Sequence, residues 1–136
     1  MSKSSCPNGA FVVVATGTEA KFFTNDGSHL DIKLRHIGGL TPKDLANDGP
    51  SGNRPPESSA QETDEATFAK QLAHDLYDRA HKGEFDNIVL VIDPDTLGEI
   101  RPVLHQEVTQ KVTMELAKTL INSPISDIER SLSAAQ

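Results

Sequence analysis

Apolar and polar positions alternate in three different ways over the first forty residues and predict three β-strands. Residues 10–15 are apolar on both faces, which is typical of a central strand covered on both sides. A tight turn at 16–18 leads to a second strand over 20–23, and the Asn-Asp-Gly sequence at 25–27 is a hairpin signal because these residues tolerate positive φ. Apolar and charged residues then alternate strictly over 30–35, which predicts a third strand at or near the sheet edge.

Helical spacing replaces this pattern in the second half of the chain. Apolar residues recur at helical spacing from Phe68 to Ala80, after a capping box at 59–62 and before Gly83, so we expect a long helix there. Residues 85–92 then form a strand with a continuous apolar centre.

Two shorter helices and one more strand complete the predicted elements. Asp93 and Pro94 suit the start of a helix, and Pro102 should kink or end it because proline lacks an amide donor. Alternation over 112–116 predicts a fifth strand, and the pair at 123–124 (Ser-Pro) opens a closing helix.

The resulting order of elements is βββαβαβα. Because strand–helix–strand crossovers are nearly always right-handed, this order favours a mixed five-stranded sheet in the order 3-2-1-4-5, with helices on both faces. The predicted fold class is therefore α/β, a ribonuclease H-like three-layer sandwich. We divide the chain into a disordered leader at 1–9 and a single domain at 10–133. A long loop at 38–62, rich in Gly and Pro, is either functional or disordered.

Length, cysteine content and charge narrow the functional classes. A chain of 136 residues fits one domain. Its single cysteine, Cys6, excludes an internal disulfide and indicates a reducing compartment. The longest apolar run is too short to span a bilayer and no secretory signal pattern is present, so we expect a cytoplasmic protein without membrane insertion. The formal charge of −7 disfavours general nucleic-acid binding.

Familiar catalytic and metal-binding patterns do not emerge from the residues. Ribonuclease H-like nucleases need a carboxylate on the first strand, which here has none, and Asp93 alone cannot clamp two cations. His74, Asp78 and His81 share a helical face, but the two histidines are about 10 Å apart along the axis, so a solvated face is the simpler interpretation. Cys6 has no visible base. We predict no catalytic residue, metal or cofactor, and lean towards a protein that is not an enzyme.

A binding site is predicted from topology instead. Ligands of open parallel sheets bind beyond the carboxyl ends of the strands at the topological switch point, which here lies between strands 1 and 4. That point gathers Thr16, Gly17 and Asp93, and the long loop would bring Arg54. Arg101 is a further candidate because arginine recognises carboxylate or phosphate. The alternative is purely structural: a turn, a helix cap and solvated arginines.

Three stretches of the sequence resemble a known bacterial family. They are 11–23 (FVVVATGTEAKFF), 85–101 (FDNIVLVIDPDTLGEIR) and 120–132, and they are similar to the proteins required for attachment to host cells. The L-G-E-I-R element at 97–101 is the most specific part. The resemblance covers about residues 10–133.

This resemblance implies a relation to the middle domain of archaeal and eukaryotic peptide-release factors. Those factors use a Gly-Gly-Gln loop to assist the hydrolysis of peptidyl-tRNA. Here Gly38-Gly39-Leu40 follows the third strand, and no Gln comes next. The sequence also departs from the family in its first turn, where Thr16 stands in place of the usual Asp.

Three functional hypotheses follow. The first is a non-enzymatic binding module of the host attachment family, acting indirectly in attachment through an unknown protein or ribosomal partner. The second is a translation-associated factor that binds the ribosome or tRNA. The third is a hydrolase with a cleft around Asp93.

Overall fold

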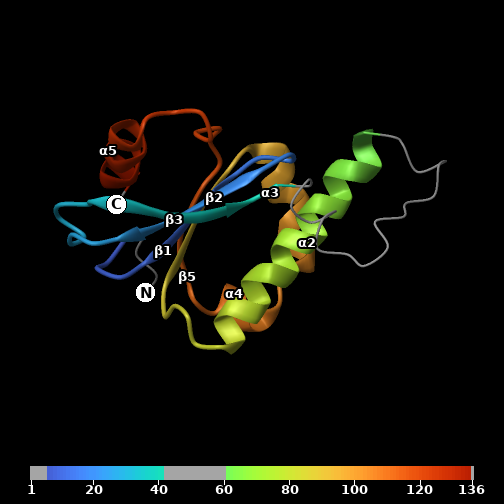
Figure 1. Cartoon of the computed structure of the whole chain (residues 1–136), viewed down its shortest axis with the longest axis horizontal. Coiled ribbons are helices and arrows are strands. Elements are labelled where there is room, and N and C mark those ends of the chain that lie inside the picture. The colour runs from blue at the N-terminus through green and yellow to red at the C-terminus, as the bar shows by residue number, and fades with distance from the viewer. Residues whose placement is uncertain (1–5, 42–60, 136) are drawn as a thin grey trace.

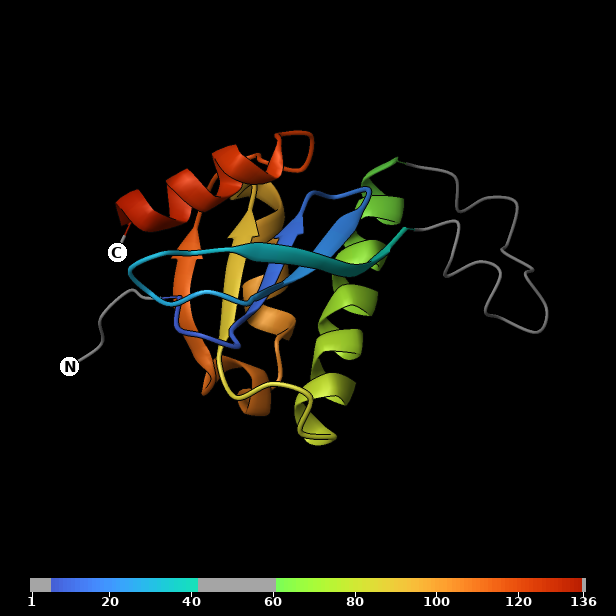
Figure 2. The same cartoon turned by 60° about the vertical axis from the view of Figure 1, so that its left-hand side comes forward.

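In the described residues, ten elements follow one another and build a sheet with helices on either side (Figures 1 and 2). The computed structural model describes residues 6–41 and 61–135, with the backbone alone over 61–67. The elements are β1 (Phe11–Ala15), β2 (Ala20–Asn25), β3 (Leu34–Leu40), α2 (Gln61–His81), β4 (Ile88–Ile92), α3 (Pro94–Ile100), the short 3-10 helix η1 (Arg101–Val103), α4 (Gln106–Thr109), β5 (Val112–Leu116) and α5 (Ile125–Ala135).

The strand order β3-β2-β1-β4-β5 confirms the predicted topology. β1 lies at the centre, antiparallel to β2 and parallel to β4, and β5 is parallel to β4. β3 pairs antiparallel with β2. The protein therefore has the predicted α/β fold with a mixed five-stranded sheet.

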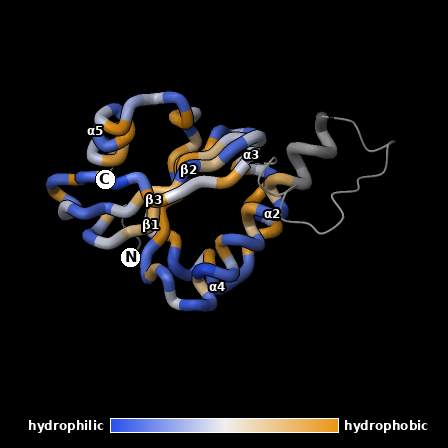
Figure 3. The backbone as a smooth tube through the Cα atoms, viewed as in Figure 1, coloured by the Kyte–Doolittle hydropathy of each residue, from blue (hydrophilic) through white to orange (hydrophobic). Residues whose placement is uncertain are grey.

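Alternate side chains of the central strands point into two separate cores. Figure 2 shows α5 on one side of the sheet and α2, α3 and α4 on the other. Val13 and Leu90 pack in the core under α2, whereas Val12 and Val89 pack in the core under α5. Hydrophobic and hydrophilic segments alternate along α5 in Figure 3, as expected for a helix that buries one stripe. β1 and β4 are buried on both faces, as their continuous apolar runs predicted.

The third strand begins later in the chain than predicted. β3 starts at Leu34 rather than at Leu30, which is 82% exposed. Asn25 provides the reason: its buried side-chain Oδ1 accepts hydrogen bonds from the backbone N–H groups of Gly27 (2.9 Å) and Lys33 (3.0 Å). The side chain thus holds residues 26–33 in a wide turn, and strand pairing resumes only where Leu34 lies opposite Asn25.

Gly38 and Gly39 lie inside β3, although a turn after the edge strand was expected. They pair with Phe22 and Lys21, so the prediction of a loop starting at residue 38 is wrong. A Cβ atom on Gly39 would lie 2.8 Å from the carbonyl oxygen of Ala20, closer than real Cβ atoms approach. A glycine at this position therefore lets β3 approach β2. The rest of the predicted loop, over 42–60, lies outside the described residues.

The predicted helices are present, with one addition. α2 is followed by Gly83 at φ +75°, α3 is capped by Asp93, and α5 begins just after Pro124. The predicted capping box at 59–62 lies outside the described side chains. The short α4, which the sequence pattern did not reveal, is capped by His105, whose Nδ1 accepts a hydrogen bond from the N–H of Glu107 (3.0 Å). Among the described residues, no helix combines the length and the apolar character needed to cross a membrane.

Two long-range polar contacts fasten the α5 side of the molecule to the β2–β3 edge. A carboxylate oxygen of Glu129, in α5, accepts a hydrogen bond from the N–H of Leu34 (2.8 Å). The ammonium group of Lys21 donates to the carbonyl of Ile121 (2.9 Å). Both contacts join residues about a hundred positions apart in the sequence.

The end of the predicted leader packs against the sheet. Cys6 is fully buried in the core under α5, and its carbonyl accepts a hydrogen bond from the Nδ2 of Asn25 (2.8 Å). The N–H of Gly9 donates to the carbonyl of Asn25 (2.8 Å). Burial raises the pKa of the Cys6 thiol to about 11. Residues 6–9 are thus held in place, and residues 1–5 lie outside the described part of the chain.

Candidate functional site

The carboxyl ends of β1 and β4 lie side by side. Their parallel register pairs Ala15 with Ile92, so the next residues, Thr16 and Asp93, leave the sheet at neighbouring positions. This is the switch point predicted from the topology, since β1 turns back into β2 while β4 leads into α3.

The turn after β1 is closed by its own polar groups. The N–H of Thr16 donates to the carbonyl of Glu19 (2.9 Å), and the N–H of Thr18 donates to the hydroxyl of Thr16 (3.3 Å). The two threonine hydroxyls are 3.2 Å apart. Thr16 and Gly17 are half-buried, whereas Thr18 is exposed at the surface of the turn.

Asp93 caps α3 with one carboxylate oxygen, and its other oxygen accepts no hydrogen bond from the described residues. Its Oδ2 accepts a hydrogen bond from the N–H of Thr96 (3.1 Å), and its carbonyl accepts one from the N–H of Leu97 (2.9 Å). Its Oδ1 is buried and has no hydrogen-bond partner among the described residues. Because an unsatisfied buried acceptor costs free energy, this oxygen favours contact with a donor.

Of the two predicted arginines, Arg101 has a described position, and it does not join this pair. Arg101 lies at the far end of α3, where its Nε and Nη2 donate to one carboxylate oxygen of Glu115 on β5 (3.2 and 2.5 Å). It is therefore a full helix length from Asp93 and paired at the β5 edge. Arg54 lies outside the described residues.

The two histidines of α2 contact different carboxylates. The Nε2 of His74 lies 3.6 Å from Asp78, whereas the Nδ1 of His81 lies 3.3 Å from Glu107 in α4. In the parts of the chain that the structure describes, no three His, Cys, Asp or Glu side chains converge on a possible metal position.

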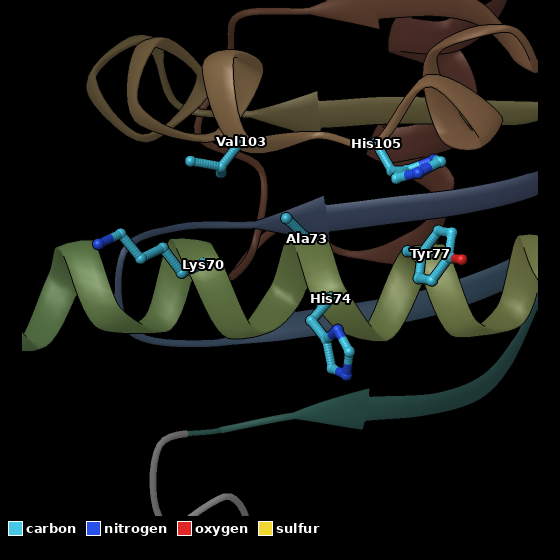
Figure 4. Close-up of a pocket in the computed structure, with 6 residues that line it drawn as sticks. All are labelled: Lys70, Ala73, His74, Tyr77, Val103 and His105. Atoms are coloured by element: carbon cyan, nitrogen blue, oxygen red, sulfur yellow. The ribbon is translucent and has the colours of Figure 1, made fainter.

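A groove between α2 and the segment from η1 to α4 was not predicted. It has a volume of about 430 Å³ and is lined by Lys70, Ala73, His74, Tyr77, Val103 and His105 (Figure 4). We call it the α2–α4 groove. Tyr77 lies within the stretch from Phe68 to Ala80 whose helical spacing predicted α2, and His105 belongs to no predicted element. Their contact depends on α4, whose four residues gave no periodic signal.

Comparison with protein-family models finds a match over most of the chain. The family model described as "Bacterial archaeo-eukaryotic release factor family 12" matches residues 9–132. No curated protein matches the chain significantly. The match covers nearly all of the domain predicted from the sequence at 10–133 and includes both β1 and α3.

Proposed function

Because the chain belongs to bacterial archaeo-eukaryotic release factor family 12, we propose that it is a non-enzymatic binding module that recognises a partner in the translation apparatus. The family match supports the link to translation. The expected partner is a ribosomal component or a tRNA, recognised by a local surface, because the overall charge of −7 disfavours binding along a phosphate backbone.

The observation that carries the proposal is the arrangement at the switch point. Thr16 and Asp93 lie at adjacent strand ends, and Asp93 has a buried oxygen without a partner among the described residues. A partner whose binding displaces the atoms that cover this oxygen would bring a hydrogen-bond donor to it and recover its lost hydrogen-bond energy. Gly17 would allow the partner to approach closely, and Arg54, a candidate from the sequence alone, would add a cation.

Peptide release is not part of the proposal. Gly38 and Gly39 serve the pairing of β3 with β2, and Leu40 follows them where a glutamine would be needed. A hydrolase centred on Asp93 is the competing hypothesis, but one oxygen of this carboxylate is engaged in capping α3. Binding without turnover therefore fits these residues better.

We also propose an indirect role of this protein in attachment to host cells. It is supported by the resemblance of 85–101, with its L-G-E-I-R element, to proteins required for attachment.

Co-sedimentation with purified bacterial ribosomes tests the proposal. We expect the wild-type protein to pellet with ribosomes and Asp93→Asn to pellet about tenfold less, which corresponds to roughly 1.4 kcal/mol. Asparagine is also a good N-cap, so this substitution keeps the α3 cap while it replaces the unpaired acceptor with a donor. Arg54→Ala should weaken binding as well, whereas Arg101→Ala should not, because Arg101 is paired with Glu115 at the far end of α3.

Arg130→Ala is the matched control, because Arg130 is an exposed arginine on α5, across the sheet from α3. Its binding and its melting temperature should equal those of the wild type. A wild-type protein that stays in the supernatant at every ribosome concentration would refute the proposal. Hydrolysis of peptidyl-tRNA that survives repurification and disappears in Asp93→Asn would support the hydrolase instead.

A further inference from the structure

The α2–α4 groove combines aromatic rings at one end with a cation at the other. Figure 4 shows Tyr77 and His105 facing each other near one end of the groove and Lys70 near the opposite end. Lys70 and Tyr77 are seven residues apart on α2, which places them about 10 Å apart along the helix axis. Between them, Ala73 and Val103 supply apolar surface.

The aromatic end is a cluster of rings from two segments. The ring centroids of Tyr77 and His105 are 4.3 Å apart with their planes inclined by 43°, and beside the groove the ring of His81 lies 5.7 Å from that of Tyr77 at an interplanar angle of 30°. The Nδ1 of His105 is held by the N–H of Glu107, which fixes the orientation of its ring. A planar ligand therefore meets a preformed aromatic surface.

The charge of the groove differs from that of the protein. Of the described residues that line it, none is a carboxylate, although the chain carries a formal charge of −7. Three described acids of α2 and α4 already have partners: Asp75 pairs with Arg79 (2.8 Å), Asp78 contacts His74 and Glu107 contacts His81. Lys70 has no ion-pair partner among the side chains that the structure describes. Its ammonium group is left to attract an anion.

We propose that the α2–α4 groove binds a nucleotide, with the base against Tyr77 and His105 and the phosphate at Lys70. Bases stack on aromatic side chains regardless of their identity, and lysine binds phosphate as a point charge. The volume of about 430 Å³ falls within the usual range for small-ligand sites. The nucleotide is either free or the end of an RNA strand. The site is separate from the switch point and does not depend on the function proposed there.

The single tyrosine makes the test direct. The chain has one Tyr and no Trp, so its intrinsic fluorescence reports on Tyr77. We expect adenosine 5′-monophosphate to change this fluorescence saturably and to bind at least about tenfold more tightly than adenosine or ribose 5-phosphate. Equal or weaker binding of the complete nucleotide would overturn the proposal, because the two ends of the groove would then not act together.

Paired variants locate the site. Lys70→Ala should weaken binding of adenosine 5′-monophosphate about tenfold in calorimetry, whereas Lys82→Ala, at an exposed lysine just after α2, should not change it. Tyr77→Phe keeps the ring and should retain binding, and Tyr77→Leu should lose it. Equal affinities for Lys70→Ala and Lys82→Ala would overturn the proposal, provided that the melting temperatures of both match the wild type.

A short oligoadenylate identifies the source of the nucleotide. If it binds more tightly than the mononucleotide and shows the same dependence on Lys70, the groove takes an RNA end. If it binds less tightly, the groove takes a free nucleotide. If an aspartate-rich peptide binds with the same dependence on Lys70 and adenosine 5′-monophosphate does not bind, the proposal is wrong and the groove is a peptide site.

Discussion

The centre and the β3 edge of the sheet are held together by different interactions. β1 and β4 bury every residue and pack between two helical layers, so nonspecific apolar burial stabilises them. β3 is buried at Leu34 but largely exposed beyond it, and it depends on individual polar contacts from Asn25 and Glu129 and on a glycine at position 39. The centre should therefore respond to lost volume, and the edge to lost hydrogen bonds.

The largest expected effect is at the centre. Leu90, on β4 beside Val13 of β1, is fully buried in the core between the sheet and α2. Leu90→Ala should lower the free energy of unfolding by about 2–5 kcal/mol, because it removes apolar contacts and leaves a cavity. Denaturant unfolding measures this, with exposed Leu30→Ala as the control, which should cost less than about 0.5 kcal/mol. If the two variants lose the same free energy of unfolding, burial at the centre of the sheet does not carry the stability assigned to it here.

A smaller loss is expected at the edge. Asn25→Ala leaves the N–H groups of Gly27 and Lys33 and the carbonyl of Cys6 without their side-chain partner, so the free energy of unfolding should fall by about 2–3 kcal/mol. Amide hydrogen exchange should accelerate at Lys33 before it does in β1. Asn122→Ala, at an exposed position, is the control. Faster exchange in β1 and β3 alike would mean that the edge is not a separate unit.

The smallest effect concerns pH. Because the pKa of Cys6 is raised from 9.0 to about 11, the unfolded state loses this proton at lower pH than the folded state does. The resulting stability is fully present below pH 9 and is lost as pH rises through about 11. Between about pH 8 and pH 10 the loss should be about 1 kcal/mol.

Cys6→Ala should remove this part of the pH dependence, which the difference between wild-type and variant unfolding curves would isolate from other alkaline titrations. Identical slopes for the two proteins would show that the thiol titrates equally in both states. The measurement also reports whether residues 6–9 stay packed beside Asn25.

The same contrast explains what could be predicted from the sequence. The centre was predictable because continuous apolar runs, such as that over 88–92, depend only on local composition. The start of β3 was not, because the side chain of Asn25 acts on Cys6 and Lys33 at a distance, and the strict alternation over 30–35 favoured a strand. The positions of Thr16 and Asp93 followed from topology.

The position of Arg101 could not be predicted in the same way. Its pairing with Glu115 depends on how the end of α3 meets the edge strand β5, which no local pattern encodes. The sequence did not predict the α2–α4 groove for a related reason. Tyr77 and His105 come together only because α4 packs on α2.

The contacts of Glu129 with Leu34 and of Lys21 with Ile121 have a consequence for the order of folding. They connect the first strands to the last residues of the domain, across 95 and 100 positions of sequence. On a ribosome the β2–β3 hairpin emerges long before α5, so it must wait for its final hydrogen bonds until the end of the chain is made. Contacts of such high sequence separation slow folding, and the nascent hairpin edge stays open to wrong strand partners during that interval.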